Sequence, residues 1–134
     1  MQKETIEIVT TKDRFFNEYL ILKKPIIDSV LTKINRKKTS LSENPLKVLA
    51  QLLYYNDMYK AEEEDKKWSI VFSRETKTAI QDTLRMKEHH LNNYISQLRN
   101  MKVLDGKKIR NLFIVYVNDD RELNFKFKFN GHSQ

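Results

Sequence analysis

Two short amphipathic segments, separated by about three residues, constrain this chain more than any other feature of its sequence. Ala79, Ile80 and Leu84 form the apolar side of the first segment, and the pattern breaks after Leu84. It resumes with helical spacing from about Glu88 to Met101. Ser73 opens the first segment, because its hydroxyl can accept from free backbone amides. The sequence therefore predicts two consecutive helices joined by a tight turn.

The composition excludes several classes of protein. The 134 residues include two glycines and no cysteine, so glycine-rich phosphate loops, disulfides and thiolate metal sites are ruled out. A chain that is 40% hydrophobic and 32% charged has the balance of one globular domain, here 1–134. The longest apolar run, Leu112 to Val117, is far shorter than the roughly 20 residues of a membrane-spanning helix. We therefore expect a soluble protein of the bacterial cytoplasm or of an infected host cell.

Positive charge is concentrated in the second half of the chain. Of the formal net charge of +7, the first 72 residues carry +2 and residues 73–134 carry +5. A basic surface favours polyanionic partners. Because 18 of the 25 basic residues are lysine, an A+T-rich genome is a second explanation, and the net charge alone carries little weight.

The first 62 residues are predicted to be mainly helical. A short strand is expected at Thr5–Val9 and a helix at Arg14–Leu22. Pro25 disfavours helix in the residue before it and suits the first turn of a new one, so a second helix is expected to start there. That helix is expected to end in the basic loop Asn35–Lys38.

A third helix is predicted from Asn44 and Pro45, a capping residue followed by a residue preset for the first turn. Its apolar arc over residues 46–59 is wider than packing against one core requires. Two interpretations stay open: a central helix buried on most sides, or a dimer interface that includes Leu52, Tyr55 and Tyr59. An acidic run, Glu62–Asp65, is expected in an exposed loop.

The C-terminal third is predicted to be extended. Trp68–Phe72 has the character of a short strand, and Asp105-Gly106 is a strong turn signal. Two strands, Lys108–Val117 and Arg121–Phe129, are then expected to form a hairpin through Asn118–Asp120.

The order of these elements is that of a winged helix-turn-helix domain. Residues 69–129 resemble that superfamily, in the form found in MarR-type regulators and in plasmid or phage replication initiators. The resemblance is carried by the apolar spacing of Ile80-Gln-Asp-Thr-Leu-Arg-Met-Lys-Glu-His-His-Leu-Asn-Asn-Tyr-Ile-Ser-Gln-Leu-Arg-Asn-Met-Lys-Val-Leu104. Arg85 and Lys102 stand where the family often has glycine. The resemblance implies a mainly α fold with a small β-hairpin wing (α+β), preceded by about three helices within residues 1–62.

One face of the predicted helix 88–101 is suited to reading DNA bases. At about 100° per residue, its polar side chains lie opposite the apolar stripe. Short amide and hydroxyl groups can donate and accept, and Asn or Gln can bind the N6/N7 edge of adenine. An ordinary solvated surface and a protein-binding face are the alternatives. The predicted base-reading residues are His89, Asn92, Asn93, Ser96, Gln97 and Asn100.

Phosphate contacts are expected on both sides of this helix. The first turn of the preceding helix and the turn between the two helices supply Ser73, Arg74, Thr76, Lys77 and Lys87. Strict alternation in Leu123–Phe129 places lysines on one face of the predicted hairpin. The wing residues expected to approach DNA are Arg121, Lys126 and Lys128. Lysines that protect an edge strand from aggregation are an equally good explanation.

Catalysis is not expected. His89 and His90 are adjacent and diverge by about 100° on a helix, so they cannot chelate one metal as an i, i+4 pair can. No motif surrounds any serine as in a nucleophile elbow, and no cofactor or metal is predicted.

The sequence thus predicts a non-catalytic protein that binds duplex DNA sequence-specifically, as a transcriptional regulator or a replication initiator-like protein of a phage, plasmid or bacterium. A homodimer would read two half-sites about one helical turn apart. The alternative is a winged-helix adaptor in a viral or replication assembly, which would bind a protein partner through helix 46–59. RNA binding is less attractive, because the aromatic residues fall on core-facing stripes.

Overall fold

The computed structural model describes residues 9–117 and 123–124. Over these residues the chain forms α1 (Lys12–Asn35), α2 (Glu43–Met58), α3 (Glu64–Val71), α4 (Arg74–Leu84) and α5 (Glu88–Asn100). A 3-10 turn, η1 (Asn111–Phe113), and two short strands, β1 (Val9–Thr10) and β2 (Leu123–Asn124), complete the described elements. None of the helices described in these ranges is long and apolar enough to cross a membrane.

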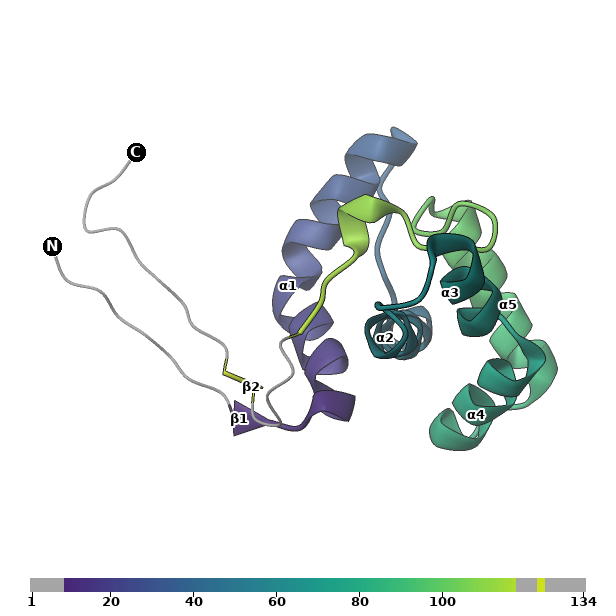
Figure 1. Cartoon of the computed structure of the whole chain (residues 1–134). Helices are drawn as coiled ribbons and strands as arrows, with labels where there is room; N and C mark the ends of the chain where they lie inside the picture. Colours follow the sequence, from purple (N-terminus) through teal and green to yellow (C-terminus); the bar gives the residue numbers. More distant parts are fainter. Residues whose placement is uncertain (1–8, 118–122, 125–134) are drawn as a thin grey trace, which may run out of the picture.

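Helix α2 is the centre of the fold. Figure 1 shows it end-on between α1 on one side and α3, α4 and α5 on the other, and it contacts all four. Val48, Leu49, Leu52 and Leu53 are fully buried, as expected for a helix that packs on several sides. The wide apolar arc therefore belongs to a core helix. Of the residues proposed for a dimer interface, Leu52 lies inside the chain's own core, and Tyr55 and Tyr59 are half-buried.

Helix α1 continues through Pro25, contrary to the prediction of two separate segments. Phe16 and Leu20 before the proline and Leu31 after it are all buried, so one side of the helix packs against the core along its length. Pro25 and Ile21 are both exposed, and Pro25 has no N–H to donate to the Ile21 carbonyl. Packing thus outweighs the local helix-breaking tendency.

The predicted start of α2 is displaced by two residues. Ser42, and not Asn44, is the N-cap residue. Asn44 lies in the first turn, where its side-chain amide donates to the Tyr94 hydroxyl of α5 at 3.0 Å. Pro45 is also in the first turn, where its missing N–H leaves no intrahelical hydrogen bond unmade.

A helix, α3, replaces the acidic loop and the strand predicted around Trp68. Glu64 and Asp65 lie in its first turn, where the helix dipole favours negative charge. Trp68, Val71 and Phe72 are buried, and their i, i+3, i+4 spacing is that of one helix face. The sequence prediction was wrong because this run is too short to separate helical from extended periodicity.

The predicted fold class is wrong in its β part, since the described residues contain no β-hairpin wing. Residues 108–117 do not form a strand; they cross the core irregularly through η1. At their end, the Val117 N–H donates to Asp57 Oδ1 at 3.0 Å and the Val117 carbonyl accepts from Lys60 Nζ at 2.8 Å. Because Asp57 of α2 and Lys60, which follows α2, hydrogen-bond to the two backbone groups of Val117, these groups are not paired with a neighbouring strand.

The strand β2 pairs elsewhere. It is antiparallel to β1, with Val9 opposite Asn124 and Thr10 opposite Leu123. The rest of the predicted hairpin, including the proposed wing residues Arg121, Lys126 and Lys128, lies outside the described residues. Of the predicted strand 5–9, only Val9 is described.

The predicted pair of helices joined by a short turn is present. Ser73 caps α4 and accepts from the Thr76 N–H at 3.2 Å, and three residues then separate α4 from α5. Arg85 and Lys102 both have left-handed backbones, with φ of 54° and 67°. The backbone conformation that glycine favours is therefore present at both positions without glycine.

Replacing Arg85 with glycine is expected to stabilise the fold. A non-glycine residue in the left-handed region costs roughly 1–2 kcal/mol, part of which is offset by the unfolded-state entropy that glycine adds. We expect Arg85→Gly to raise the free energy of unfolding by about 0.5–1 kcal/mol in urea denaturation. The control Asp82→Gly, at an exposed position inside α4, should lower it by about 1 kcal/mol. A loss in both variants would show that Arg85 is not strained.

Candidate nucleic-acid interface

Helix α5 has one buried face and one exposed face. Leu91, Ile95 and Leu98 are buried, and this stripe packs on α2 and α4. All six residues predicted to read bases are exposed, namely His89, Asn92, Asn93, Ser96, Gln97 and Asn100. In the described part of the chain, none of these six side chains makes a hydrogen bond. Their donors and acceptors are thus free to bind an external partner.

A cleft between α4 and α5 brings two predicted groups together. Its volume is about 390 Å³, and its α4 side is lined by Arg74, Lys77, Thr78 and Gln81. On the α5 side it is lined by Glu88 and Asn92. Two proposed phosphate ligands, Arg74 and Lys77, and one proposed base-reading residue, Asn92, therefore line the same cleft. The Glu88 carboxylate in this cleft would repel a bound anion.

Ser73 and Thr76 are not placed as phosphate ligands. Thr76 is buried, and its hydroxyl donates to the Ile70 carbonyl at 2.7 Å. The Ser73 hydroxyl accepts from the Thr76 amide as the cap of α4. The Thr76 hydroxyl thus joins α4 to the end of α3, and the Ser73 hydroxyl is used within the first turn of α4. Lys87, by contrast, is exposed at the N-cap position of α5.

The cations of the molecule fall into two groups. Those in ion pairs belong to α1, α2, α3 and the residues after α2, namely Lys12, Lys24, Lys47, Lys60, Lys66 and Lys67. Over residues 73–117, no Lys or Arg forms an ion pair with another described residue. Positive charge on and beside α4 and α5 is therefore not held in ion pairs with described carboxylates, although Glu88 lines the α4–α5 cleft and the pKa of Glu64 is lowered by Lys67 and also by Lys108.

Sequence reasoning missed several of these cations. Arg85 lies in the tight turn, and the others surround the C-terminal end of α5: Arg99, Lys102, Lys107, Lys108 and Arg110. Three of them line a second cleft of about 420 Å³ with Asp105 and Gly106. Arg99 Nε donates to the Gly106 carbonyl at 3.2 Å. Only Lys108 and Arg110 lie in the predicted strand Lys108–Val117; the sequence signal for this group is the high density of basic residues around the end of the predicted reading helix.

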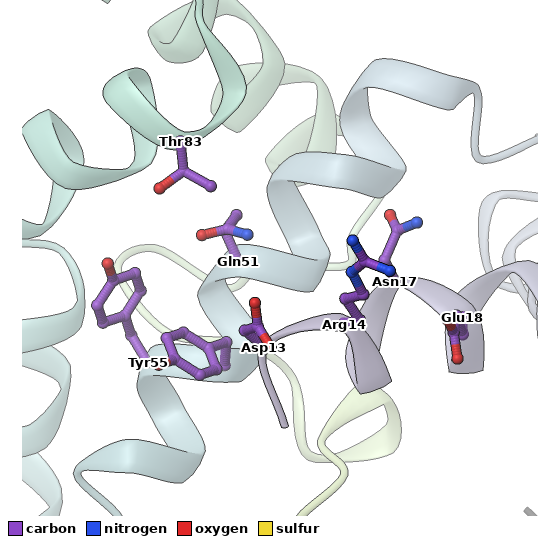
Figure 2. Close-up of a pocket in the computed structure, with 8 residues that line it drawn as sticks. Asp13, Arg14, Asn17, Glu18, Gln51, Tyr55 and Thr83 are labelled. Atoms are coloured by element: carbon purple, nitrogen blue, oxygen red, sulfur yellow. The ribbon is translucent and has the colours of Figure 1, made fainter. Parts of the chain in front are cut away.

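A cavity of about 480 Å³ lies behind this surface, between α1, α2 and α4. Figure 2 shows Thr83 extending from α4 towards Gln51 of α2, while Arg14 and Asn17 project from α1. Its charged lining is mixed, since Asp13 and Glu18 accompany Arg14. This balance does not favour a polyanion.

His89 and His90 form no metal site with the other described residues. The rings of His89 and His90 are in contact, with centroids 4.0 Å apart, although we expected the two side chains to diverge. No three His, Cys, Asp or Glu side chains among the described residues are grouped to hold a metal ion.

Comparison with known proteins gives no information about function, so the functional argument depends on the surface of α5. No family model matches the chain, and no curated protein or solved structure is significantly similar to it.

Proposed function

We propose that the chain binds duplex DNA sequence-specifically and without catalysis, as a transcriptional regulator or a replication initiator-like protein. Helix α5 would lie in the major groove, with α4 against the phosphate backbone. The observation that carries the proposal is the exposed row of short polar side chains on α5, bordered by cations that form no ion pair with another described residue.

The residue types support this function over an ordinary solvated surface. Solvated helix faces are usually filled by Glu, Lys, Gln and Arg, which favour the helix. The exposed face of α5 instead carries Asn92, Asn93, Ser96 and Asn100, which are weaker helix formers. Asparagine can bind adenine through two hydrogen bonds in the major groove. The choice of residues costs helix stability, which base recognition would explain.

Removal of two cations from the α4–α5 cleft is expected to weaken DNA binding. Each phosphate contact releases about one counterion, so log K falls with log[salt] with a slope of about −0.9 per contact. We expect Arg74→Gln/Lys77→Gln to lower affinity for a mixed-sequence duplex about tenfold or more and to reduce the slope by about 2. Fluorescence anisotropy between about 50 and 200 mM salt measures both quantities.

The opposite change provides an internal control. Glu88→Gln removes the carboxylate of the same cleft and should strengthen binding. A wild-type protein that binds no duplex at low salt would overturn the proposal. Selection of bound fragments from random DNA then tests sequence preference and half-site symmetry together.

A protein-interaction adaptor is the second candidate function, and an apolar stripe favours it. Leu22 and Ile26 of α1 are four residues apart on one face of the helix and are 38% and 60% exposed. This stripe lies on α1, whereas the sequence had suggested helix 46–59 as the contact surface. The salt titration separates the two functions, because an adaptor that binds through this stripe needs no affinity for DNA.

A further inference from the structure

The segment Arg36–Lys38, which we call the basic loop, follows α1 directly. Its three consecutive basic residues are all exposed. Within residues 9–117 and 123–124, none of the three forms an ion pair. The sequence identified this run only as the end of a helix, and no role in the proposed function has been given to it.

Hydrogen bonds place the connection between α1 and α2 alongside α5. The Asn35 side-chain amide, immediately before the basic loop, donates to the Met101 carbonyl at 2.9 Å. At the other end of the connection, the Asn44 amide donates to the Tyr94 hydroxyl. The basic loop therefore lies at the C-terminal end of α5.

The basic loop and α4 border opposite edges of the polar face of α5. At about 100° per residue, Tyr94 and Met101 lie on one side of the buried Leu91, and Asn92 lies on the other. Asn92 faces the cleft formed with α4. The predicted base-reading face is thus exposed between two separate cationic elements.

The basic loop is held in place from both ends. Asp28 of α1 accepts from the Leu41 amide at 2.8 Å and from the Ser40 hydroxyl at 3.0 Å. Thr32 and Thr39 exchange two hydrogen bonds, at 3.0 and 3.2 Å. Partial burial raises the pKa of Asp28, but hydrogen bonds from Leu41, Lys24 and Ser40 outweigh it and the net pKa lies below its usual value. Asp28 therefore stays charged at neutral pH, and these hydrogen bonds tie the residues that follow the basic loop to α1.

We propose that the basic loop is a second phosphate-binding element, which contacts duplex DNA on the side of the major groove opposite Arg74 and Lys77. This inference rests on the proposed function. A 13-residue helix such as α5 is about 20 Å long, and the major groove is about 12 Å wide. Cations at both ends of α5 can thus reach phosphates of both strands.

Helix electrostatics offer a competing role for the same cations. Arg36 follows the last residue of α1, where a positive charge complements the helix dipole. A purely structural role predicts that neutral variants lose stability, with no effect on the salt dependence of DNA binding. Measuring both the stability and the salt dependence of DNA binding therefore distinguishes the two roles.

The decisive variant is Lys37→Gln/Lys38→Gln in the full chain, which leaves the left-handed Arg36 unchanged. We expect its affinity for a short mixed-sequence duplex to fall about tenfold, and its salt slope to become shallower by about 2. Urea denaturation should give the wild-type midpoint. The preference for a selected site over mixed sequence should also be unchanged, because phosphate contacts carry no direct sequence information.

The matched control, Lys23→Gln/Lys66→Gln, removes two charges from α1 and α3 and should retain the wild-type slope. If the wild type binds and the basic-loop variant has the same affinity and slope, the inference is wrong while the proposed function stands. If both double variants lose affinity equally, net charge and not the basic loop is responsible. If the wild type binds no duplex, the proposed function fails and this inference fails with it.

Discussion

Asn93→Ala/Asn100→Ala is expected to abolish the sequence preference of DNA binding and to leave non-specific affinity nearly unchanged. Both asparagines lie on the exposed face of α5, opposite Leu91. A bidentate contact between asparagine and adenine discriminates by about 1–3 kcal/mol, which is about 5- to 150-fold per residue. Anisotropy titrations with a selected site and with mixed-sequence DNA measure the ratio.

The variant should also fold normally, since alanine favours the helix more than asparagine does. Ser29→Ala/Asn111→Ala changes two exposed polar residues outside α4 and α5 and should keep the wild-type ratio. Unchanged selectivity in Asn93→Ala/Asn100→Ala would remove α5 as the reading element and favour the adaptor function.

Leu52→Ala is expected to lower the free energy of unfolding by about 3 kcal/mol, within the usual range for a buried leucine. Leu52 is fully buried in α2, and α2 contacts the other four described helices. The cavity left by the substitution would lie where several elements meet. Urea denaturation monitored by circular dichroism gives the value.

Met58→Ala is the matched control on the same helix. Met58 is 46% exposed, so its loss should cost well under about 1 kcal/mol. If Leu52 belonged to a dimer interface, as the sequence allowed, the stability lost in Leu52→Ala would depend on protein concentration. A concentration-independent loss supports a core position.

The parts of the fold that could be predicted depend on local periodicity. Helices α4 and α5 each bring apolar residues to one side at i, i+3 and i+4, so their bounds followed closely from the sequence. The predicted helix break at Pro25 was wrong, because burial of Phe16, Leu20 and Leu31 stabilises the helix more than the proline destabilises it. The predicted hairpin failed because Val117 binds Asp57 and Lys60, which are distant in sequence.

For the candidate site, the sequence predicted the exposed residues of α5 but not the contacts of the surrounding residues. The exposed face of α5 follows from helix geometry alone, and the structure places all six predicted residues on it. The sequence alone does not distinguish Thr76 from a phosphate ligand. Its structural role depends on the hydrogen bond from its hydroxyl to the Ile70 carbonyl, which only the fold reveals. The position of Arg36–Lys38 depends on the hydrogen bond from Asn35 to Met101, which no sequence pattern reveals.

The central place of α2 limits how this protein can be dissected or reused. The buried side of α5 rests on α2, so an excised fragment containing α4 and α5 alone would expose Leu91, Ile95 and Leu98 to water. The α4–α5 pair is therefore not a portable cassette. Grafting it onto another scaffold would require transplanting the first two helices with it.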